Sequence, residues 1–430
     1  MYHLVIREFR EFKTPPPFSF FCDSMDSIIT KLTAQQVWEE FLAYRLKKGK
    51  FNWREFEQTD TFVETEQYLP LVNSIIEGGG LSIPQKRVVN KRGTNKKRVV
   101  YSFYEDEMTL LKLLAHMLYK YDGAFANNCY AFRRGVRASD AVRRLYSKVR
   151  GKGLWAYKLD IQNYFNSISV PILLPLLKDL LADDQMLYDF FERVLTDDRC
   201  ISGSQVVVEQ KGVMAGVPLA SFLANVYLNE VDHYFADRGV VYARYSDDII
   251  LFAEDLETLQ LYRAKMMEFI AKYNLQVNPT KERIYTPEEP YEFLGFKCGS
   301  NHIDISESGV VKMKGKIRRK MRALLRWKMR KGHSAERAMA SLINYFNRKF
   351  YDTDLEDTLT WSRWYFPVIT SSESLRIIDQ YLQQSIRALA TGRHNKSNYR
   401  ITYEHLKQLG YRSLVHEYYK QREQRDAMDA

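Results

Sequence analysis

The sequence predicts an α+β fold in which helices pack against a sheet. A strand-like apolar run, Leu154–Leu159, ends at Asp160, and a second stretch, Val240–Phe252, reads as two strands interrupted by Tyr245-Ser246-Asp247-Asp248. Between them, Pro218–Phe235 has the apolar periodicity of a helix. Strands and helices mixed in this way along one chain indicate an α+β sheet covered by helices.

Residues 1–75 form the first predicted region, an extension followed by helices. Pro15-Pro16-Pro17 precedes a helix-like stretch, Thr33–Leu46, that carries apolar residues at helical spacing. Met25 is an alternative start of the chain, in which case the residues before it add little to the fold.

The second predicted region, residues 76–305, opens with a basic hairpin. Two β-prone runs, Arg87-Val88-Val89 and Arg98–Tyr101, flank the turn-rich basic segment Asn90–Lys97. A helix with one broad apolar face follows over Met108–Leu118.

The third predicted region, residues 306–430, is helical. Its first part, Lys312–Lys331, is dense in Lys and Arg and contains Trp327. The last stretch, from Leu375 to Tyr419, is helical with basic and aromatic residues. RNA docking, oligomer contact and ordinary packing all remain open for it.

Composition and charge favour a folded protein with a polyanionic partner. The 430 residues are 45% hydrophobic and 27% charged, which is typical of a folded chain and not of a disordered one. Lys and Arg number 64 against 53 acidic residues, a net charge of +11 that favours nucleic acid, although a solvated basic surface is the alternative.

Cysteine spacing and hydropathy bear on the compartment. Cys22, Cys129, Cys200 and Cys298 lie too far apart to suggest a zinc site or a disulfide framework. No apolar run approaches the roughly 18 residues of a membrane span, and the N-terminus lacks a signal-peptide pattern. We therefore expect a reducing, cytoplasmic location and no membrane partner.

Three aspartates predict a metal site. Adjacent Asp247 and Asp248 in a strand hairpin repel each other unless a cation offsets their charge, and hard carboxylate oxygens suit Mg²⁺. Asp160 closes another apolar strand, so a hairpin beside that strand would gather all three for two-metal phosphoryl transfer. The alternative is an ordinary turn pair at Asp247-Asp248 and a helix cap at Asp160.

These residues resemble the motifs of reverse transcriptases. Tyr245-Ser246-Asp247-Asp248 resembles the Tyr-x-Asp-Asp motif, and it follows segments similar to motifs A and B, Leu159–Ile168 and Lys211–Ser221. Segments similar to motif D and the primer grip come after it, Val277–Lys281 and Tyr291–Phe296. The ordered set implies a right-hand fold: fingers and an antiparallel palm sheet within 76–305, and a helical, basic thumb and C-terminal region over 306–430.

The resemblance implies roles for residues around the aspartates. Asp160, Asp247 and Asp248 would be catalytic and bind two Mg²⁺ ions, for which Mn²⁺ can substitute, with Asp248 in a supporting role and Ile161 also at the metal and the nucleotide. Lys281 would protonate the departing pyrophosphate. Phe165 would exclude a 2′-hydroxyl and so select deoxynucleotides, unless it is a core aromatic.

The resemblance also predicts the nucleotide pocket. Lys86 and Arg98 are placed like the basic residues that hold the triphosphate, and Arg98 is the stronger candidate because a guanidinium grips phosphate oxygens in pairs. Gly212 and Gly216 would let the motif B backbone approach template and nucleotide. Ala215 stands where relatives often have Gln, which puts template-base contact in doubt.

A further set of residues is predicted to touch nucleic acid. Template and primer contacts are expected in the fingers segment, the Tyr-x-Asp-Asp motif, the primer grip and the basic helix, at Arg133, Arg134, Tyr245, Leu294, Gly295, Lys316 and Arg319. Tyr130 and Phe132, which interleave with the first two, could stack on bases or belong to the core.

Among reverse transcriptases, the chain most resembles prokaryotic ones, and best fits the defence-associated group related to abortive-infection polymerases. Retron and group II intron enzymes are more distant, because the retron thumb element and the intron zinc-type cysteines are not found. The implied activity is copying of a structured noncoding RNA into DNA from deoxynucleoside triphosphates, giving a product duplex. Template-independent synthesis, a retron enzyme and a silent RNA-binding scaffold are the alternatives, and the oligomeric state stays open.

Overall fold

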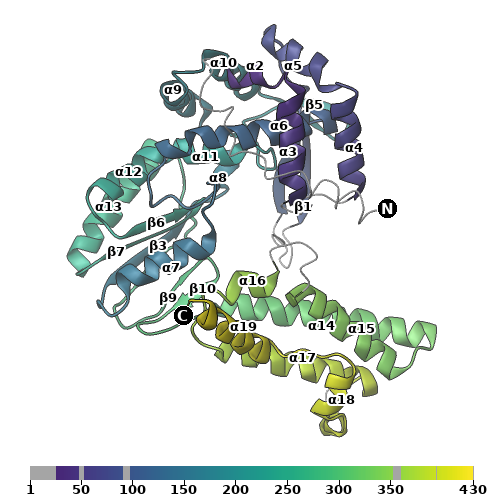
Figure 1. Cartoon of the computed structure of the whole chain (residues 1–430). Helices are drawn as coiled ribbons and strands as arrows, with labels where there is room; N and C mark the ends of the chain where they lie inside the picture. The colour runs from purple at the N-terminus through teal and green to yellow at the C-terminus, as the bar shows by residue number, and fades with distance from the viewer. Residues whose placement is uncertain (1–25, 48–52, 91–96, 352–359, 394, 430) are drawn as a thin grey trace. The chain divides into compact units, whose positions relative to one another are not determined.

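The computed structural model describes residues 26–47, 53–90, 97–351, 360–393 and 395–429 (Figure 1). The prolines at 15–17, Met25, Cys22 and the middle of the basic turn at 91–96 lie outside these residues. The chain forms two compact units, the first of Met1–Arg137 with Tyr157–Ile284 and the second of Ala138–Ala156 with Tyr285–Ala430.

The first unit begins with helices around a buried tryptophan. Trp38 is fully buried on α3, where it packs against Phe62 and Tyr68 from the next two helices, with ring centroids 5.6 and 4.8 Å away. Its indole N–H donates to the carbonyl of Leu32 at 2.8 Å. The helix predicted at Thr33–Leu46 is confirmed, because α3 spans Gln35–Lys47. The helices of this part are α2 (Ile28–Lys31), α3 (Gln35–Lys47), α4 (Trp53–Glu64), α5 (Tyr68–Ile76), α6 (Glu105–Met117) and the 3₁₀ helix η2 (Leu118–Ala124).

The basic hairpin is the first sheet of this unit. Strands β1 (Gln85–Asn90) and β2 (Lys97–Ser102) pair antiparallel from Gln85 opposite Ser102 to Asn90 opposite Lys97, as predicted. Two further strands, β4 (Arg199–Ser202) and β5 (Gln205–Val208), complete the order β2-β1-β4-β5. The β1–β4 pair is parallel, so a segment more than 100 residues later extends the hairpin.

The central sheet has the order β6-β7-β3-β8 and contains both strand-like runs expected from the sequence. Its strands are β3 (Trp155–Asp160), β6 (Tyr242–Tyr245), β7 (Asp248–Ala253) and β8 (Arg283–Tyr285). β6 and β7 pair antiparallel, with Tyr245 opposite Asp248. Helices of the same unit are α8 (Tyr164–Ser167), α9 (Val170–Leu180), α10 (Gln185–Thr196), α11 (Ala220–Tyr227), α12 (Asn229–Asp237) and α13 (Leu256–Lys272). α9 packs against α10 and α11, and α13 against β7.

The second unit joins a small antiparallel sheet to a helical bundle. The sheet has the order β11-β10-β9, and α14 packs against α15 and α17. α14 buries residues at helical spacing, Val310, Met313, Ile317, Met321 and Leu324, and this stripe faces the bundle core. The elements are α7 (Ala138–Val149), β9 (Tyr291–Phe293), β10 (Phe296–Cys298), β11 (Ile303–Ile305), α14 (Glu307–Lys331), α15 (Ala335–Tyr351), α16 (Trp361–Tyr365), α17 (Glu373–Thr391), η3 (Lys396–Arg400), α18 (Tyr403–Gln408) and α19 (Leu414–Asp429).

Two sequence expectations on cysteine and hydropathy can be compared with the described residues. Cys129, Cys200 and Cys298 are buried free thiols. Among the helices in the described part of the chain, none combines the length and the apolar character that crossing a bilayer demands.

Candidate active site

The Tyr-Ser-Asp-Asp segment forms the tight turn between β6 and β7. Because Tyr245 pairs with Asp248, only Ser246 and Asp247 lie in the turn. Ser246 has a φ of 62°, in the left-handed region that two-residue hairpin turns require. Asp247 is thus presented at the tip of the hairpin, and Asp248 begins the next strand.

Asp160 lies beside this turn at the end of β3. The main-chain N–H of Ile161 donates to the carbonyl of Asp247 at 3.0 Å and fastens the turn to β3. Burial raises the pKa of Asp247, and the negative charge of Asp160 raises it further. The structure therefore brings Asp160 and Asp247 together, as the sequence predicts.

Asp248 has a different environment. Burial raises the pKa of its carboxyl to about 6, against an opposing effect of the Lys158 ammonium on β3. The two charged groups are 3.3 Å apart, and their side chains are 17% and 21% exposed. Asp248 is thus held by a lysine that the sequence analysis did not single out.

Lys281 and Arg98 add positive charge around the first two carboxylates. The ammonium of Lys281 pairs with the Asp160 carboxylate, and the Asn278 N–H donates to the Asp160 carbonyl at 2.8 Å. The charges of Lys281 and Arg98 both act to lower the pKa of Asp247. Two residues predicted for pyrophosphate and triphosphate therefore lie within electrostatic reach of the aspartates.

The donor set fits a magnesium site that the substrate completes. Within the described residues, no group of three or more His, Cys, Asp or Glu side chains is arranged to hold a metal. Mg²⁺ is usually held by one or two carboxylates together with substrate phosphates and water. Asp160 and Asp247 provide such carboxylates, and Ile161, whose apolar side chain is buried, can contribute only main-chain oxygen.

An aromatic row borders the β6–β7 turn. The Phe165 ring lies 6.1 Å from that of Phe132, which lies 6.3 Å from the ring of Tyr245. Phe165 is half-buried, and Phe132 is 37% exposed, with a φ of 59°. Phe132 is thus on the surface side of this row, whereas its neighbour Tyr130 is buried in the core.

The motif B glycines contact the protein's own backbone. A Cβ on Gly212 would lie 2.3 Å from the carbonyl oxygen of Phe165, and one on Gly216 would lie 2.9 Å from that of Tyr101. Their φ values are 55° and 107°, which also favour glycine. The close approach that the structure requires is therefore to motif A and to β2. Approach to template and nucleotide remains a prediction.

Asn166 links these segments. Its side-chain oxygen accepts from the Ala215 N–H at 2.9 Å, and its amide donates to the Val99 carbonyl at 3.2 Å. The Ala215 carbonyl in turn accepts from the Tyr101 N–H at 2.8 Å. Ala215 is therefore fixed through its main chain, and its methyl group offers no hydrogen bond to a substrate.

The two basic residues predicted at the triphosphate differ in their contacts. The Lys86 ammonium pairs with Glu209, whose carboxylate also accepts from the Tyr101 hydroxyl at 2.6 Å. Arg98 is exposed on β2. Among the residues that the structure describes, Arg98 has no ion pair like that of Lys86, so it can reach a ligand more readily.

The residues predicted to touch nucleic acid are dispersed. Arg133 donates to the carbonyls of Asp122, Ala126 and Cys129 at 2.9–3.3 Å, so its guanidinium holds a loop together. The exposed Arg134 donates its N–H to the Asp122 carboxylate at 2.7 Å. Tyr245 ends β6 in the same unit, and the other four belong to the second unit.

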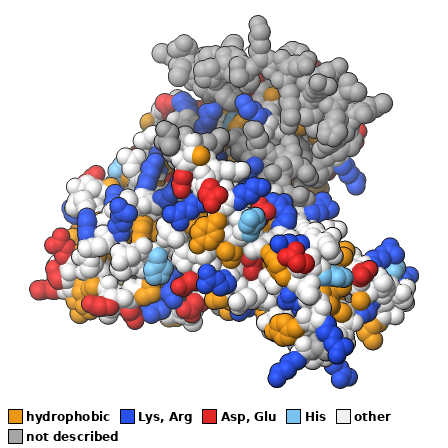
Figure 2. All heavy atoms as spheres, turned by 60° about the horizontal axis from the view of Figure 1, so that its bottom comes forward, with side chains coloured by type: hydrophobic (Ala, Val, Ile, Leu, Met, Phe, Trp, Pro, Cys, Tyr) orange, Lys and Arg blue, Asp and Glu red, His pale blue; other side chains and the backbone are white. Residues whose placement is uncertain are grey.

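In that unit, Leu294 and Gly295 form the turn between β9 and β10, with φ values of 50° and 83°. Lys316 and Arg319 are exposed on α14. Lys and Arg side chains recur over the face shown in Figure 2, with acidic groups among them.

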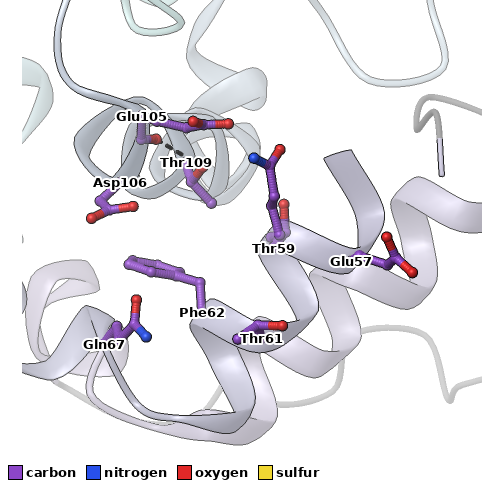
Figure 3. A pocket seen from close by; sticks show the side chains of 9 residues that line it. Glu57, Thr59, Thr61, Phe62, Gln67, Glu105, Asp106 and Thr109 are labelled. Atoms are coloured by element: carbon purple, nitrogen blue, oxygen red, sulfur yellow. Dashed lines mark hydrogen bonds between the residues drawn. The ribbon is translucent and has the colours of Figure 1, made fainter. Parts of the chain in front are cut away.

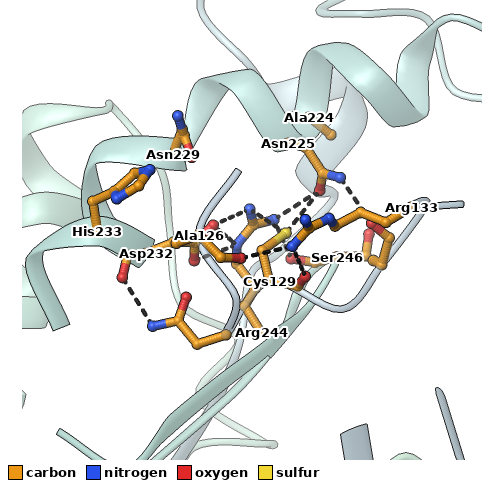
Figure 4. A network of polar contacts seen from close by, with 12 residues as sticks. Ala126, Cys129, Arg133, Ala224, Asn225, Asn229, Asp232, His233, Arg244 and Ser246 are labelled. Carbon is orange, nitrogen blue, oxygen red and sulfur yellow. Dashed lines mark hydrogen bonds and ion pairs between the residues drawn. The ribbon is translucent and has the colours of Figure 1, made fainter. Parts of the chain in front are cut away.

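Sequence reasoning missed a buried ion pair beneath the turn. Arg244 on β6 and Asp232 on α12 are both fully buried and form a salt bridge (Figure 4). An arginine inside the apolar run Tyr242–Tyr245 was the available signal, because a buried guanidinium requires a buried acceptor. Nothing local in the sequence identifies that acceptor as Asp232.

A separate pocket lies between α4 and α6 (Figure 3). Its lining combines the Phe62 ring with polar and acidic groups, including Glu57, Glu105 and Asp106. None of the residues assigned above to metal, nucleotide or nucleic acid lines it, and it has no evident part in the chemistry of the aspartates.

Comparison with known proteins points to one family. Residues 89–298 match the family model described as reverse transcriptase (RNA-dependent DNA polymerase). A segment of 106 residues, 24% of this chain, is 26% identical to the retron Ec86 reverse transcriptase of Escherichia coli, and spans about a third (33%) of that protein's length.

Solved structures with some similarity include two yeast telomerases. Apo telomerase of Candida tropicalis is 12% identical, with a TM-score of 0.46 over 87% of this chain and 77% of that one. Telomerase of Candida albicans with an RNA fragment is 14% identical, with a TM-score of 0.36 over 81% and 68%.

The family match begins at the end of β1 and covers β2, the segments similar to motifs A and B, the β6–β7 turn and the β9–β10 turn. Together with the mixed sheets and helices it confirms the α+β, right-hand polymerase fold predicted from the sequence. The part of the chain that carries the three aspartates is accordingly similar to reverse transcriptase domains.

Proposed function

We propose that this protein is a reverse transcriptase that synthesises DNA on an RNA template by two-metal nucleotidyl transfer. The observation that carries the proposal is the meeting of Asp160 and Asp247 at the β3 end and the β6–β7 turn, where burial and mutual repulsion raise the pKa of Asp247. Such a carboxylate pair is suited to a divalent cation. Because the carboxylate pair lies within the residues that match the reverse transcriptase family model, nucleotidyl transfer is the chemistry that we propose for it.

In this mechanism, Asp160, Asp247 and a main-chain oxygen at Ile161 would hold the ions, and Asp248 supports them. Bound Mg²⁺, or Mn²⁺ in its place, supplies charge neutralisation at the attacking and leaving oxygens of the phosphoryl transfer. Asp248 keeps its own counter-ion in Lys158, so it shapes the field at the turn without being a principal ligand.

The cations around the carboxylates would serve the incoming nucleotide. Arg98 is exposed near Asp247 and is available to grip triphosphate oxygens, with Lys86 able to join by leaving Glu209. Lys281, beside Asp160, is in position to give a proton to the departing pyrophosphate. Phe165 would close the pocket against a ribose 2′-hydroxyl, next to Ala215 and Gly216.

The nucleic acid would follow the basic and aromatic surfaces. Exposed cations recur at helical spacing along α14, at Lys312, Lys316, Arg319, Arg326 and Arg330. Such a stripe suits the phosphates of a product duplex. Tyr245 beside the turn, the exposed Arg134, and Leu294 and Gly295 at the expected primer grip complete the proposed contacts, whereas the Arg133 guanidinium is already used by its own loop. In this scheme 76–305 is the fingers and palm, and 306–430 the thumb and C-terminal region.

The test compares polymerase activity in matched variants. The purified chain is given a primed RNA, Mg²⁺ and deoxynucleotides, and extension is followed on a sequencing gel. Asp247→Ala should abolish extension. Asp237→Ala, which removes an exposed carboxylate of α12, should leave it unchanged. Extension by the Asp247→Ala protein at the wild-type rate would refute the proposal.

We further infer a prokaryotic, cytoplasmic enzyme that copies a structured noncoding RNA in antiphage defence, with a retron enzyme as the alternative. The similarity to a retron reverse transcriptase supports a prokaryotic enzyme. Sequencing the RNA that copurifies with the protein, and the DNA made when nucleotides are added, tests the partner. Phage challenge of cells that express the wild-type or Asp247→Ala protein tests the role.

Template-independent synthesis is the second candidate. It is favoured by Ala215, whose side chain supplies no amide to the nucleotide and whose main chain is engaged by Asn166 and Tyr101. Product sequencing separates the two, because DNA complementary to no RNA present excludes copying.

A further inference from the structure

Beneath the catalytic turn lies a polar network that the roles above do not use. We call it the Arg244 network: Arg244, Asp232, Asn225, Cys129 and the carbonyl of Ser246 (Figure 4). The Arg244 Nε donates to both Asp232 oxygens, at 2.8 and 3.1 Å, and Nη2 also contacts that carboxylate. Both side chains are 0% exposed.

The guanidinium reaches beyond its counter-ion to the catalytic turn. Nη1 donates to the Ser246 carbonyl at 3.4 Å and to the Asn225 side-chain oxygen at 3.3 Å, while Nη2 lies 3.2 Å from the Cys129 sulfur. Because the guanidinium is planar and carries donors on every side, it can engage all of these groups at once, which an ammonium cannot do.

Each of the two turn residues accepts one hydrogen bond at its main-chain carbonyl. The Arg244 guanidinium holds the carbonyl of Ser246, and the Ile161 N–H holds the carbonyl of Asp247. Ser246 is also in the left-handed conformation that sets the direction in which the chain leaves the turn. These two hydrogen bonds therefore hold the turn that carries the Asp247 carboxylate next to Asp160.

The main chain of Arg244 also binds the loop that contains Asn128 and Tyr130, just before Phe132. Its main-chain N–H donates to the Asn128 carbonyl, and its carbonyl accepts from the Tyr130 N–H, both at 2.9 Å. Asn225 adds a bond from its amide to the Ala131 carbonyl at 2.8 Å. The loop that leads to Phe132 and the β6–β7 turn are thus joined through one residue, Arg244, by its main chain and its guanidinium together.

We propose that Arg244 is a positioning residue for the metal-binding turn, with Asp232 orienting its guanidinium. The proposal rests on the proposed function and deepens it, because it assigns to this buried pair the placement of Asp247. A buried ion pair is not needed for stability as such, since apolar replacements of both partners are commonly tolerated. What this ion pair adds is an oriented guanidinium N–H that donates to the Ser246 carbonyl.

The decisive variant is the double substitution Arg244→Met, Asp232→Leu. It removes both buried charges together, so no unpaired charge is left in the core, and it removes the donor to Ser246. Tyr242→Phe is the matched control, because it takes away a hydroxyl bond to Asp232 of 2.8 Å and leaves the Arg244 donor in place. Thermal unfolding establishes that each variant is folded.

The readout is Mn²⁺ binding, measured by electron paramagnetic resonance with a dideoxy-terminated primer, an RNA template and the matching nucleotide. Loss of a group that directly holds a metal ligand costs about 10- to 100-fold in metal affinity. Because Arg244 acts through Ser246, one residue before the ligand Asp247, a fall of about 10-fold is expected for the double variant and none for Tyr242→Phe. The affinity for the primed template should stay at the wild-type value.

A folded double variant with wild-type Mn²⁺ affinity would overturn the proposal. If the double variant does not fold, Arg244→Lys decides, because it keeps a positive charge beside Asp232 but lacks the planar set of donors. Should Arg244→Lys fail to fold as well, the pair serves the fold and the proposal is equally wrong. A wild-type protein that binds Mn²⁺ but extends no primer would refute the polymerase and leave this test valid.

Discussion

Replacing Asp248 by Asn should stabilise the fold at neutral pH. The pKa of this carboxyl rises from 3.8 to about 6 on folding, chiefly by burial. A folded-state pKa above the unfolded one means that the stability it contributes is complete below about pH 3.8 and is lost as the pH rises through about 6. An amide of the same shape does not titrate and avoids that loss.

The size of the effect follows from the shift. About two pKa units at 1.36 kcal/mol each give roughly 3 kcal/mol as an upper limit at pH 7.5. The Asn variant also deprives Lys158 of its counter-ion, which offsets part of the gain. We therefore expect Asp248→Asn to raise the free energy of unfolding by about 1 to 3 kcal/mol at pH 7.5.

Urea unfolding of both proteins with EDTA, at pH 7.5 and pH 4.0, measures this difference. The gap between variant and wild type should be largely closed at pH 4.0, where the wild-type carboxyl is protonated in the folded state. Asp237→Asn, at an exposed site, should show no gap at either pH. A variant that is less stable than wild type at pH 7.5, or a gap that is the same at both pH values, would refute the reasoning.

Three further predictions concern the neighbouring residues. Lys281→Met should slow single-turnover extension by about 100-fold or more while leaving the nucleotide KM near wild type, because it removes a proton donor; rapid quench at saturating nucleotide measures this. Gly216→Ala should lower the Tm more than Gly203→Ala does, since both have positive φ but only the first places a Cβ 2.9 Å from the Tyr101 carbonyl; equal losses would show that backbone conformation alone matters. Phe165→Ala should raise the kcat/KM for ribonucleotides relative to deoxynucleotides about 10-fold or more, as expected when a bulky side chain that excludes a hydroxyl is removed; an unchanged ratio would make it a core aromatic.

The elements that carry the aspartates could be predicted from the sequence because local patterns specify them. β3 and the β6–β7 hairpin are apolar runs with polar residues at the turn, and the basic hairpin has its own turn signal. The stretch around Asp160 and the turn around Asp247 then meet because adjacent strands of one sheet bring their ends together.

The partners of these side chains could not be predicted in the same way. Lys158 faces Asp248 across a strand pair, and Arg244 meets Asp232 from a helix, so each pairing depends on tertiary packing. Arg133 shows the reverse effect, because its position in a basic motif favours nucleic acid, whereas its guanidinium is used by three carbonyls of its own loop.

The division of the chain has a consequence for its biogenesis. Helix α7 belongs to the second unit, where Tyr146 on α7 lies within electrostatic reach of Tyr291 and Cys298. On the ribosome, α7 emerges well over a hundred residues before these partners are synthesised, and the intervening chain folds into the other unit. Contacts this distant in sequence form late. The second unit therefore cannot be completed from residues 285–430 alone, and a fragment produced by cutting the chain once before residue 285 would lack a part of its own core.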